Sequence, residues 1–223
     1  MMSRTPVYIV CSPRPGVGKT LMARLAAEFL LLSRGSVAAF DINLKEPSLV
    51  DYLPHLTETA SIDDTLGKMA LMDRLIVNDG LAKVVDLGFH AFDEFFRMCD
   101  EIGFAKEGER RGIEPILLFL SDAHRASTQA YRMLRETLPT TAIVPVDNEF
   151  ILQGERPPGF PATRMLPVAA LPPFLRTYIE RLTFSFTGYL REAPDASSEL
   201  HQWTRRNYTN LRDIALNLKQ YRA

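Results

Sequence analysis

The feature that most constrains the fold is a glycine-containing loop between an apolar run and a periodic segment. Residues 7–11, VYIVC, are nearly all apolar, which predicts a strand buried on both faces. Residues 12–18 form a loop rich in proline and glycine. Residues 20–33 then carry apolar side chains at helical spacing, and Arg34-Gly35 predicts the helix end. This order of elements is typical of an α/β domain.

The rest of the chain repeats this alternation. Further strands are predicted at residues 37–40, 81–85, 116–120 and 142–146. Further helices are predicted at residues 62–72, 92–102, 126–138, 173–190 and 199–221. The connecting segments are predicted to be an irregular stretch, a charged loop and a proline-rich surface connection at residues 44–59, 106–112 and 153–173. Because strands that alternate with helices pair in parallel, we expect an α/β three-layer sandwich with a mostly parallel, twisted sheet flanked by helices.

Composition narrows the class of protein. With 223 residues, the chain is long enough for one sizeable domain, and its net charge of −1 excludes a globally basic surface. The two cysteines have no paired spacing, which argues against a disulfide framework or a zinc site. We see no secretory signal and expect a cytoplasmic protein. We expect residues 1–192 to form the domain and residues 193–223 to form a helical extension packed on it.

The loop itself follows a phosphate-binding pattern. Residues 13–20, PRPGVGKT, match G-x-x-x-x-G-K-[ST] except that Pro13 replaces the first glycine. Backbone amides at a helix N-terminus attract an anion, Lys19 would neutralise the β- and γ-phosphates, and the Thr20 hydroxyl would ligate Mg²⁺. The predicted nucleotide contacts in this segment are Arg14, Pro15, Gly16, Val17, Gly18, Lys19, Thr20 and Leu21.

These residues resemble a known family. Residues 14–20, RPGVGKT, resemble the K-G-G-V-G-K-T loop of the ParA/MinD family of partitioning and division-site ATPases, within the SIMIBI class of P-loop NTPases. Asp41-Ile42-Asn43 stands where that family has an acidic D-x-D segment, and Asp86 stands at the place of the Walker B aspartate. Residues 167–172, PVAALP, are similar to the late loop that borders the adenine. The resemblance covers about residues 5–190 and is strongest at the loop.

The resemblance implies roles for the acidic and amide positions. Asp86 would bond a magnesium-bound water, and Asp41 would help to hold the magnesium hydration shell. Asn43 would then replace the acid that orients the attacking water, which predicts slow hydrolysis. A second alignment gives the water-orienting role to Asp41 instead. Asn148 would contact the base edge, although its surroundings equally suit a plain turn.

The loop departs from the family pattern in three places. Arg14 stands where the family has a signature lysine that reaches the phosphates of a partner subunit, and arginine and lysine differ in reach and geometry. Pro13 and Pro15 each remove a backbone amide donor.

The predicted catalytic residues are Lys19, Asp41, Asn43 and Arg14, and the predicted magnesium ligands are Thr20, Asp41 and Asp86.

The resemblance implies a slow ATPase that binds ATP or ADP with Mg²⁺ and acts as a nucleotide-dependent dimerisation switch. It would form an ATP-dependent homodimer and position or partition DNA or a protein assembly. The alternatives are a small-molecule ligase or kinase on the same scaffold, and a nucleotide-binding interaction protein with little hydrolysis. The terminal segment has an apolar stripe at helical spacing and the basic residues Arg205, Arg206, Arg212, Lys219 and Arg222, which suit packing or DNA contact better than a membrane surface.

Overall fold

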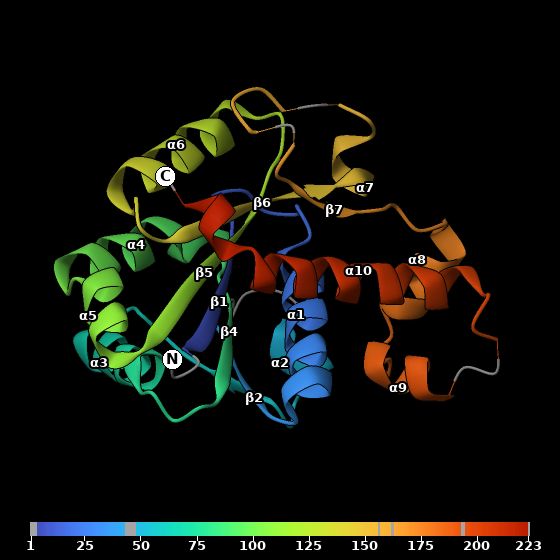
Figure 1. Cartoon of the computed structure of the whole chain (residues 1–223), viewed down its shortest axis with the longest axis horizontal. Coiled ribbons are helices and arrows are strands. Elements are labelled where there is room, and N and C mark those ends of the chain that lie inside the picture. Colours follow the sequence, from blue (N-terminus) through green and yellow to red (C-terminus); the bar gives the residue numbers. More distant parts are fainter. Residues whose placement is uncertain (1–3, 43–47, 156, 162, 193–194, 223) are drawn as a thin grey trace.

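A parallel sheet forms the centre of the molecule (Figure 1). The computed structural model describes residues 4–42, 48–155, 157–161, 163–192 and 195–222. Within these residues the sheet has seven strands in the order β3-β2-β4-β1-β5-β6-β7, and every neighbouring pair is parallel. The strands are β1 (Thr5–Cys11), β2 (Val37–Asp41), β3 (Thr57–Thr59), β4 (Ala82–Asp86), β5 (Ile113–Leu120), β6 (Ala142–Asn148) and β7 (Leu166–Val168).

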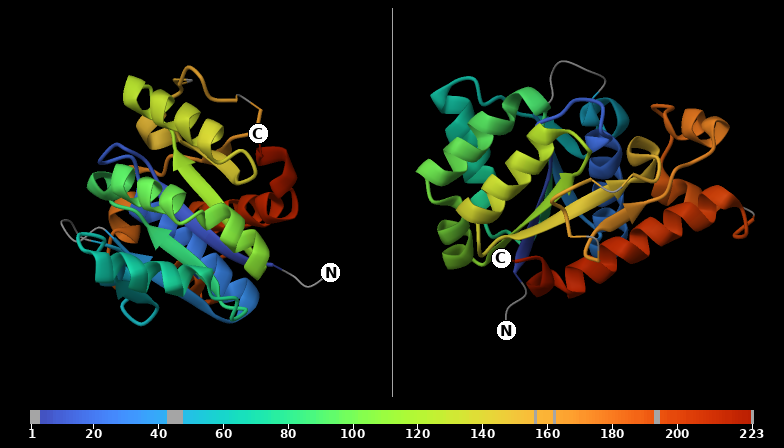
Figure 2. Two further views of the ribbon diagram at one scale, coloured as in Figure 1. Left: turned by 90° about the vertical axis from the view of Figure 1, so that its left-hand side faces the viewer. Right: turned by 90° about the horizontal axis from the view of Figure 1, so that it is seen from above.

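Helices cover both faces of this sheet (Figure 2). One face packs on α1 (Lys19–Arg34), α2 (Leu49–Tyr52), α8 (Pro173–Ile179), α9 (Phe186–Glu192) and α10 (Glu199–Leu216). The other packs on α3 (Thr65–Ile76), α4 (Phe92–Glu101), α5 (Phe104–Arg111) and α6 (Arg125–Thr137). The short elements are α7 (Glu149–Leu152) and the 3₁₀ turns η1 (Phe89–Ala91) and η2 (Leu218–Tyr221). The predicted three-layer α/β architecture is therefore confirmed.

The first strand, β1, contributes apolar side chains to the cores on both faces of the sheet. All seven residues of β1 are buried, and successive side chains point to opposite faces of the sheet. Val7 and Ile9 belong to the core on the α3–α6 side, whereas Tyr8 and Val10 belong to the core on the α1 side. A strand with helices on both sides needs apolar residues at every position, which is the pattern that predicted it.

The segment at residues 106–112 was predicted to be a charged loop, and this prediction is wrong. It lies mostly in α5, a helix that starts at the buried Phe104 and ends at Gly112, whose φ is 76°. Glu107 pairs with both Arg110 and Arg111 along the helix. The density of charged residues led to the wrong prediction of a loop. These charges lie on the exposed side of the helix, where ion pairs between residues three and four apart support helical structure.

Other elements also differ from prediction. Residues 57–59 form the short edge strand β3 inside the stretch predicted to be irregular, and residues 166–168 form the edge strand β7 inside the predicted surface connection. The predicted helix at residues 173–190 is split into α8 and α9. Arg24 of α1 donates hydrogen bonds to the carbonyls of Ile179 and Phe184, at 2.9 and 3.2 Å. This guanidinium therefore satisfies carbonyl groups that the break leaves without helical partners.

The last long helix contributes to the same core as the domain. Leu200, Trp203, Leu211 and Ile214 of α10 are buried in the cluster that covers the α1 side of the sheet. Its predicted extension to residue 221 is interrupted at Asn217, after which η2 follows. The domain boundary at residues 192/193 stays a prediction. Among the helices that the structure describes, none is long and apolar enough to cross a bilayer.

We predict that Leu25→Ala destabilises the fold by about 2–5 kcal/mol, because it leaves a cavity where α1 meets the sheet. Leu25 is fully buried in the α1-side core. The matched control is Leu216→Ala, since Leu216 is 76% exposed and its truncation should change stability by less than about 0.5 kcal/mol. Chemical denaturation of both variants measures the difference. Equal losses would contradict the assigned packing of α1.

Candidate functional site

The predicted site residues meet at the carboxyl edge of the sheet. The glycine loop follows β1, Asp41 ends β2, Asp86 ends β4 and Asn148 ends β6. Asp41 and Asp86 are directly paired in the register of β2 and β4, and Val10 pairs with Asp86 across β1 and β4. Because parallel strands end at the same edge, residues far apart in the sequence surround one loop there.

The loop depends on two glycines with left-handed backbone. Gly16 has φ 70° and Gly18 has φ 95°, a region that other residues rarely adopt. Gly18 caps the N-terminus of α1, the end of a helix that favours anions. A Cβ atom at Gly18 would lie 2.5 Å from Nδ2 of Asn148, so a side chain at residue 18 would displace the Asn148 amide.

Lys19 is held against its own loop. Its side chain is buried, and its Nζ donates a hydrogen bond of 2.6 Å to the carbonyl oxygen of Arg14. The ammonium also lies 5.9 Å from the centre of the exposed Phe89 ring. The side chain therefore curls back across residues 14–18, where an incoming phosphate would meet it.

One carboxylate oxygen of Asp86 accepts a hydrogen bond, and the other has no hydrogen-bond partner among the described residues. Its Oδ2 accepts a hydrogen bond of 2.7 Å from Oγ1 of Thr20. Its Oδ1 is buried and has no hydrogen-bond partner in the described part of the chain. Burial raises the pKa of Asp86 to about 7; the Thr20 bond opposes this shift, the nearby Asp41 adds to it and Lys19 opposes it.

The Thr20–Asp86 pair fits a magnesium site. A hydroxyl and a carboxylate are ligands or second-sphere partners that Mg²⁺ uses when phosphates and waters supply the other oxygens. The orphaned Oδ1 of Asp86 is the acceptor that a magnesium-bound water needs. Across the described residues, no group of three or more His, Cys, Asp or Glu side chains could hold a metal by itself.

Asp41 has a structural partner. Its side chain is fully buried, and its Oδ2 accepts a hydrogen bond of 3.0 Å from the backbone N–H of Val50 at the start of α2. Asp41 therefore fixes α2 beside the site as well as placing a carboxylate near Asp86. The predicted water-orienting position, Asn43, lies outside the described residues.

Asn148 lies beside the loop and is held there by a hydrogen bond from its side-chain amide. Its Nδ2 donates a hydrogen bond of 3.0 Å to the carbonyl oxygen of Val17. It also lines a pocket of about 340 Å³ together with Gly16, Gly18, Leu21 and residues 168–171. The structure thus brings together the loop, Asn148 and most of the segment predicted to border a base. We call this space the loop pocket.

Sequence reasoning missed several residues of the loop pocket. Trp203 lines it and donates from Nε1 to the carbonyl oxygen of Ala169 at 2.7 Å. Arg176 places its guanidinium 4.2 Å from the centre of the Phe150 ring, and both residues line the pocket. These residues lie on α7, α8 and α10, so only the tertiary fold brings them to the loop.

Arg14 lies near an acid that was also missed. Its Nε is 3.6 Å from Oδ2 of Asp122, and its side chain is partly exposed. Asp122 comes two residues after the end of β5, so a carboxylate close behind a predicted strand was the available signal. The pair leaves Arg14 at the rim of the loop rather than inside the loop pocket.

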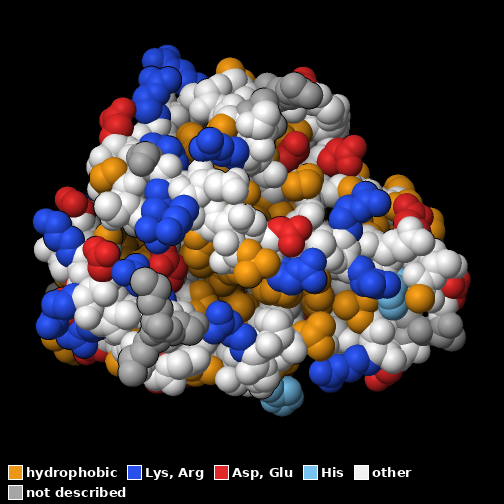
Figure 3. All heavy atoms as spheres, in the orientation of Figure 1, with side chains coloured by type: hydrophobic (Ala, Val, Ile, Leu, Met, Phe, Trp, Pro, Cys, Tyr) orange, Lys and Arg blue, Asp and Glu red, His pale blue; other side chains and the backbone are white. Residues whose placement is uncertain are grey.

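On the face drawn in Figure 3, Lys and Arg side chains are spread among other side chains rather than gathered in one patch. Arg205, Arg206, Arg212 and Lys219 are exposed, but Arg212 lies 3.5 Å from Asp213. Arg222 instead donates to Glu114 at 2.6 Å. Lys and Arg side chains are spread over this face among apolar side chains, so the predicted DNA contact stays a prediction.

We predict that Asp86→Asn stabilises the chain in the absence of nucleotide and magnesium. Because the folded-state pKa of about 7 lies above the ordinary aspartate pKa of 3.8, the folded wild type loses stability as pH rises between these values. The gain of the variant should therefore grow from pH 4 to pH 7, by at most about 1.4 kcal/mol per pH unit, and then level off. Asp73→Asn, at an exposed carboxylate on α3, should show no such growth. Chemical denaturation of the wild type and both variants at several pH values measures the free energy of unfolding. A stability gain of Asp86→Asn that shrinks as pH rises would contradict the raised pKa.

Comparison with protein-family models finds no match to this chain. Comparison with curated proteins finds none either. The family resemblance therefore rests on the loop and on the strand ends themselves.

Proposed function

We propose that the chain binds Mg²⁺-ATP on the loop at residues 14–20 and acts in the cytoplasm as a ParA/MinD-type dimerisation switch. The observation that carries the proposal is that three features share one sheet edge. They are a left-handed glycine loop at a helix N-terminus, a carboxylate with an orphaned buried oxygen, and a pocket of about 340 Å³. Together they suit a polyphosphate, a magnesium ion and a base.

Lys19 supports this proposal through the contact that it makes. Its ammonium donates a hydrogen bond to the Arg14 carbonyl oxygen. A triphosphate would exchange this neutral acceptor for charged oxygens, and hydrogen bonds between charged groups are stronger than those to neutral ones. Nucleotide binding would therefore release the Arg14 carbonyl and loosen residues 14–16.

Slow turnover is the form of the activity that we favour. The Asp41 carboxylate is fully buried and already bonds Val50, so orienting an attacking water would require it to give up a structural contact. This observation also supports the second candidate, a nucleotide-binding interaction protein with little hydrolysis. In both candidate functions, the bound nucleotide favours a dimer whose surface contacts DNA or a partner protein.

We predict that Lys19→Ala weakens Mg²⁺-ATP binding by about 100-fold or more, because the phosphates lose their buried cation. Isothermal titration calorimetry measures the affinity. Lys219→Ala, at an exposed lysine of η2, is the control and should bind as the wild type does. Wild-type affinity in the Lys19 variant would contradict the assigned loop, and no heat with the wild type would end the proposal.

We predict that Arg14→Ala keeps ATP affinity within a few-fold but loses most of the ATP-dependent dimer. Arg14 lies at the rim of the loop with a partly exposed side chain, so it can reach a second subunit better than its own nucleotide. Size-exclusion chromatography with light scattering, in ATP and in ADP, measures the dimer. Arg14→Lys, which keeps the charge but not the bidentate geometry, tests how far the guanidinium itself is needed. Equal dimerisation of the wild type and Arg14→Ala would refute the role.

A further inference from the structure

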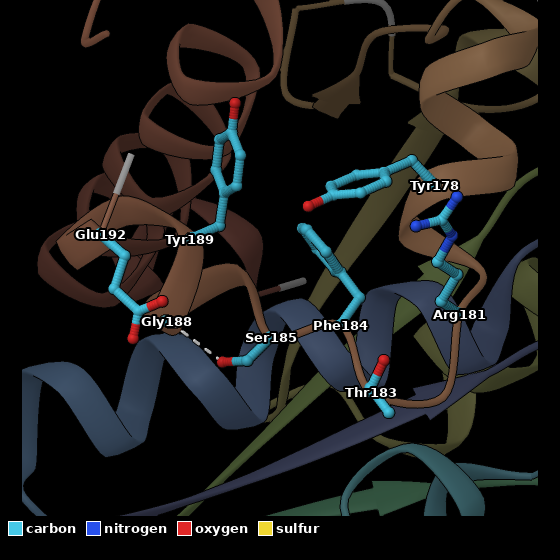
Figure 4. A pocket seen from close by; sticks show the side chains of 8 residues that line it. All are labelled: Tyr178, Arg181, Thr183, Phe184, Ser185, Gly188, Tyr189 and Glu192. Carbon is cyan, nitrogen blue, oxygen red and sulfur yellow. Dashed lines mark hydrogen bonds between the residues drawn. The ribbon is translucent and has the colours of Figure 1, made fainter. Parts of the chain in front are cut away.

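A second pocket lies between α8 and α9 (Figure 4). It measures about 450 Å³ and shares no lining residue with the loop pocket. Its lining residues come from α8, from the turn that follows it and from α9: Tyr178, Arg181, Thr183, Phe184, Ser185, Gly188, Tyr189 and Glu192. The volume is in the range of pockets that bind small organic ligands. We call this space the α8–α9 pocket.

Three aromatic rings form its walls. The Tyr178 and Phe184 rings lie 5.2 Å apart, and the Phe184 and Tyr189 rings lie 5.9 Å apart. The Tyr178 and Tyr189 rings close the set at 6.4 Å. Such rings offer apolar faces to an apolar side chain, and their edge contacts with one another limit their movement.

The floor of the pocket is fixed by buried side chains of α1. Arg24 donates to the carbonyl oxygen of Phe184, and Ser185 donates from Oγ to Oε2 of Glu28. The same Glu28 oxygen accepts from the N–H of Thr187 at 2.9 Å. The turn that carries Phe184 and Ser185 is therefore held before any ligand arrives, which lowers the ordering cost of binding.

Opposite charges stand on opposite sides of this pocket. Figure 4 shows Glu192 on the α9 side and Arg181 across from it, with the aromatic rings between. The Arg181 guanidinium lies 4.9 Å from the centre of the Tyr178 ring. Among the residues that the structure describes, neither Arg181 nor Glu192 forms an ion pair with another side chain. Both charges are thus available to a ligand that carries a cation and an anion.

We propose that the α8–α9 pocket binds a short zwitterionic peptide with apolar side chains. Its carboxylate would face Arg181, its ammonium would face Glu192, and its apolar side chains would pack on the three rings. A phosphate-rich ligand fits less well, because Glu192 would repel it. An uncharged apolar ligand would leave both charges beside it unpaired.

Calorimetry on the full chain without nucleotide tests the proposal with three probes. They are the dipeptide Leu-Phe, its N-acetylated form and its C-terminal amide. We expect Leu-Phe to bind the wild type, and each capped form to bind about fivefold more weakly, since each cap removes one partly exposed charge pair. In Glu192→Gln the N-acetyl cap should cost nothing further, whereas the amide cap should still weaken binding. Arg181→Gln should show the reverse pattern.

The control variant is Arg191→Gln, at an exposed arginine of α9 that does not line the pocket. It should keep the wild-type response to both caps. Since Arg181 and Glu192 are exposed, thermal unfolding should show that their variants fold as the wild type does. The proposal is overturned if millimolar Leu-Phe gives no binding heat, or if each cap weakens binding equally in the wild type and in both variants. None of these outcomes depends on nucleotide binding.

Discussion

The buried Arg24 guanidinium connects the two halves of the α1 side of the molecule. It bonds the carbonyl groups on either side of the α8–α9 break and stacks on the rings of Tyr52 and Phe186, at 4.0 and 5.0 Å from their centres. Burial lowers the pKa of Arg24, and Glu28, one turn further along α1, opposes that shift. Burying such a charge costs free energy unless its donors are used. Here the two terminal nitrogens donate to carbonyl groups, whereas the buried Nε has no hydrogen-bond partner among the described residues. Through these two bonds, the helix that begins at the loop also positions α8 and α9.

The sequence predicts the strands best where both faces are buried. Val7 to Cys11 and Ile116 to Leu120 are continuous apolar runs of five residues, and no helix in the described part of the chain carries an apolar run of that length. The edge strands β3 and β7 have only three residues each, too few for a periodic signal. The break between α8 and α9 could not be predicted either, because it depends on hydrogen bonds from Arg24, about 155 residues earlier in the chain.

The residues of the candidate site could likewise be predicted only in part from the sequence. Lys19, Thr20 and Asp86 were identified because a local pattern fixes their place: a glycine loop between strand and helix, and an acid at the end of an apolar strand. The structure then brings Thr20 and Asp86 into direct contact. Arg176 and Trp203 carry no such pattern, because an arginine and a tryptophan on amphipathic helices have many ordinary uses. Their place in the loop pocket follows only from how α8 and α10 pack against the loop.

The two pockets constrain each other through α8. This helix and the residue after it give Arg176, Ile179 and Glu180 to the loop pocket, while Tyr178 and Arg181 line the α8–α9 pocket. Neighbouring positions on a short helix point in different directions, so one helix can form a wall of both spaces. A displacement of α8 would therefore change the shape of both pockets at once. Arg24 opposes such a displacement because it holds the C-terminal carbonyl of α8, and the position of α1 thus sets the geometry of both pockets.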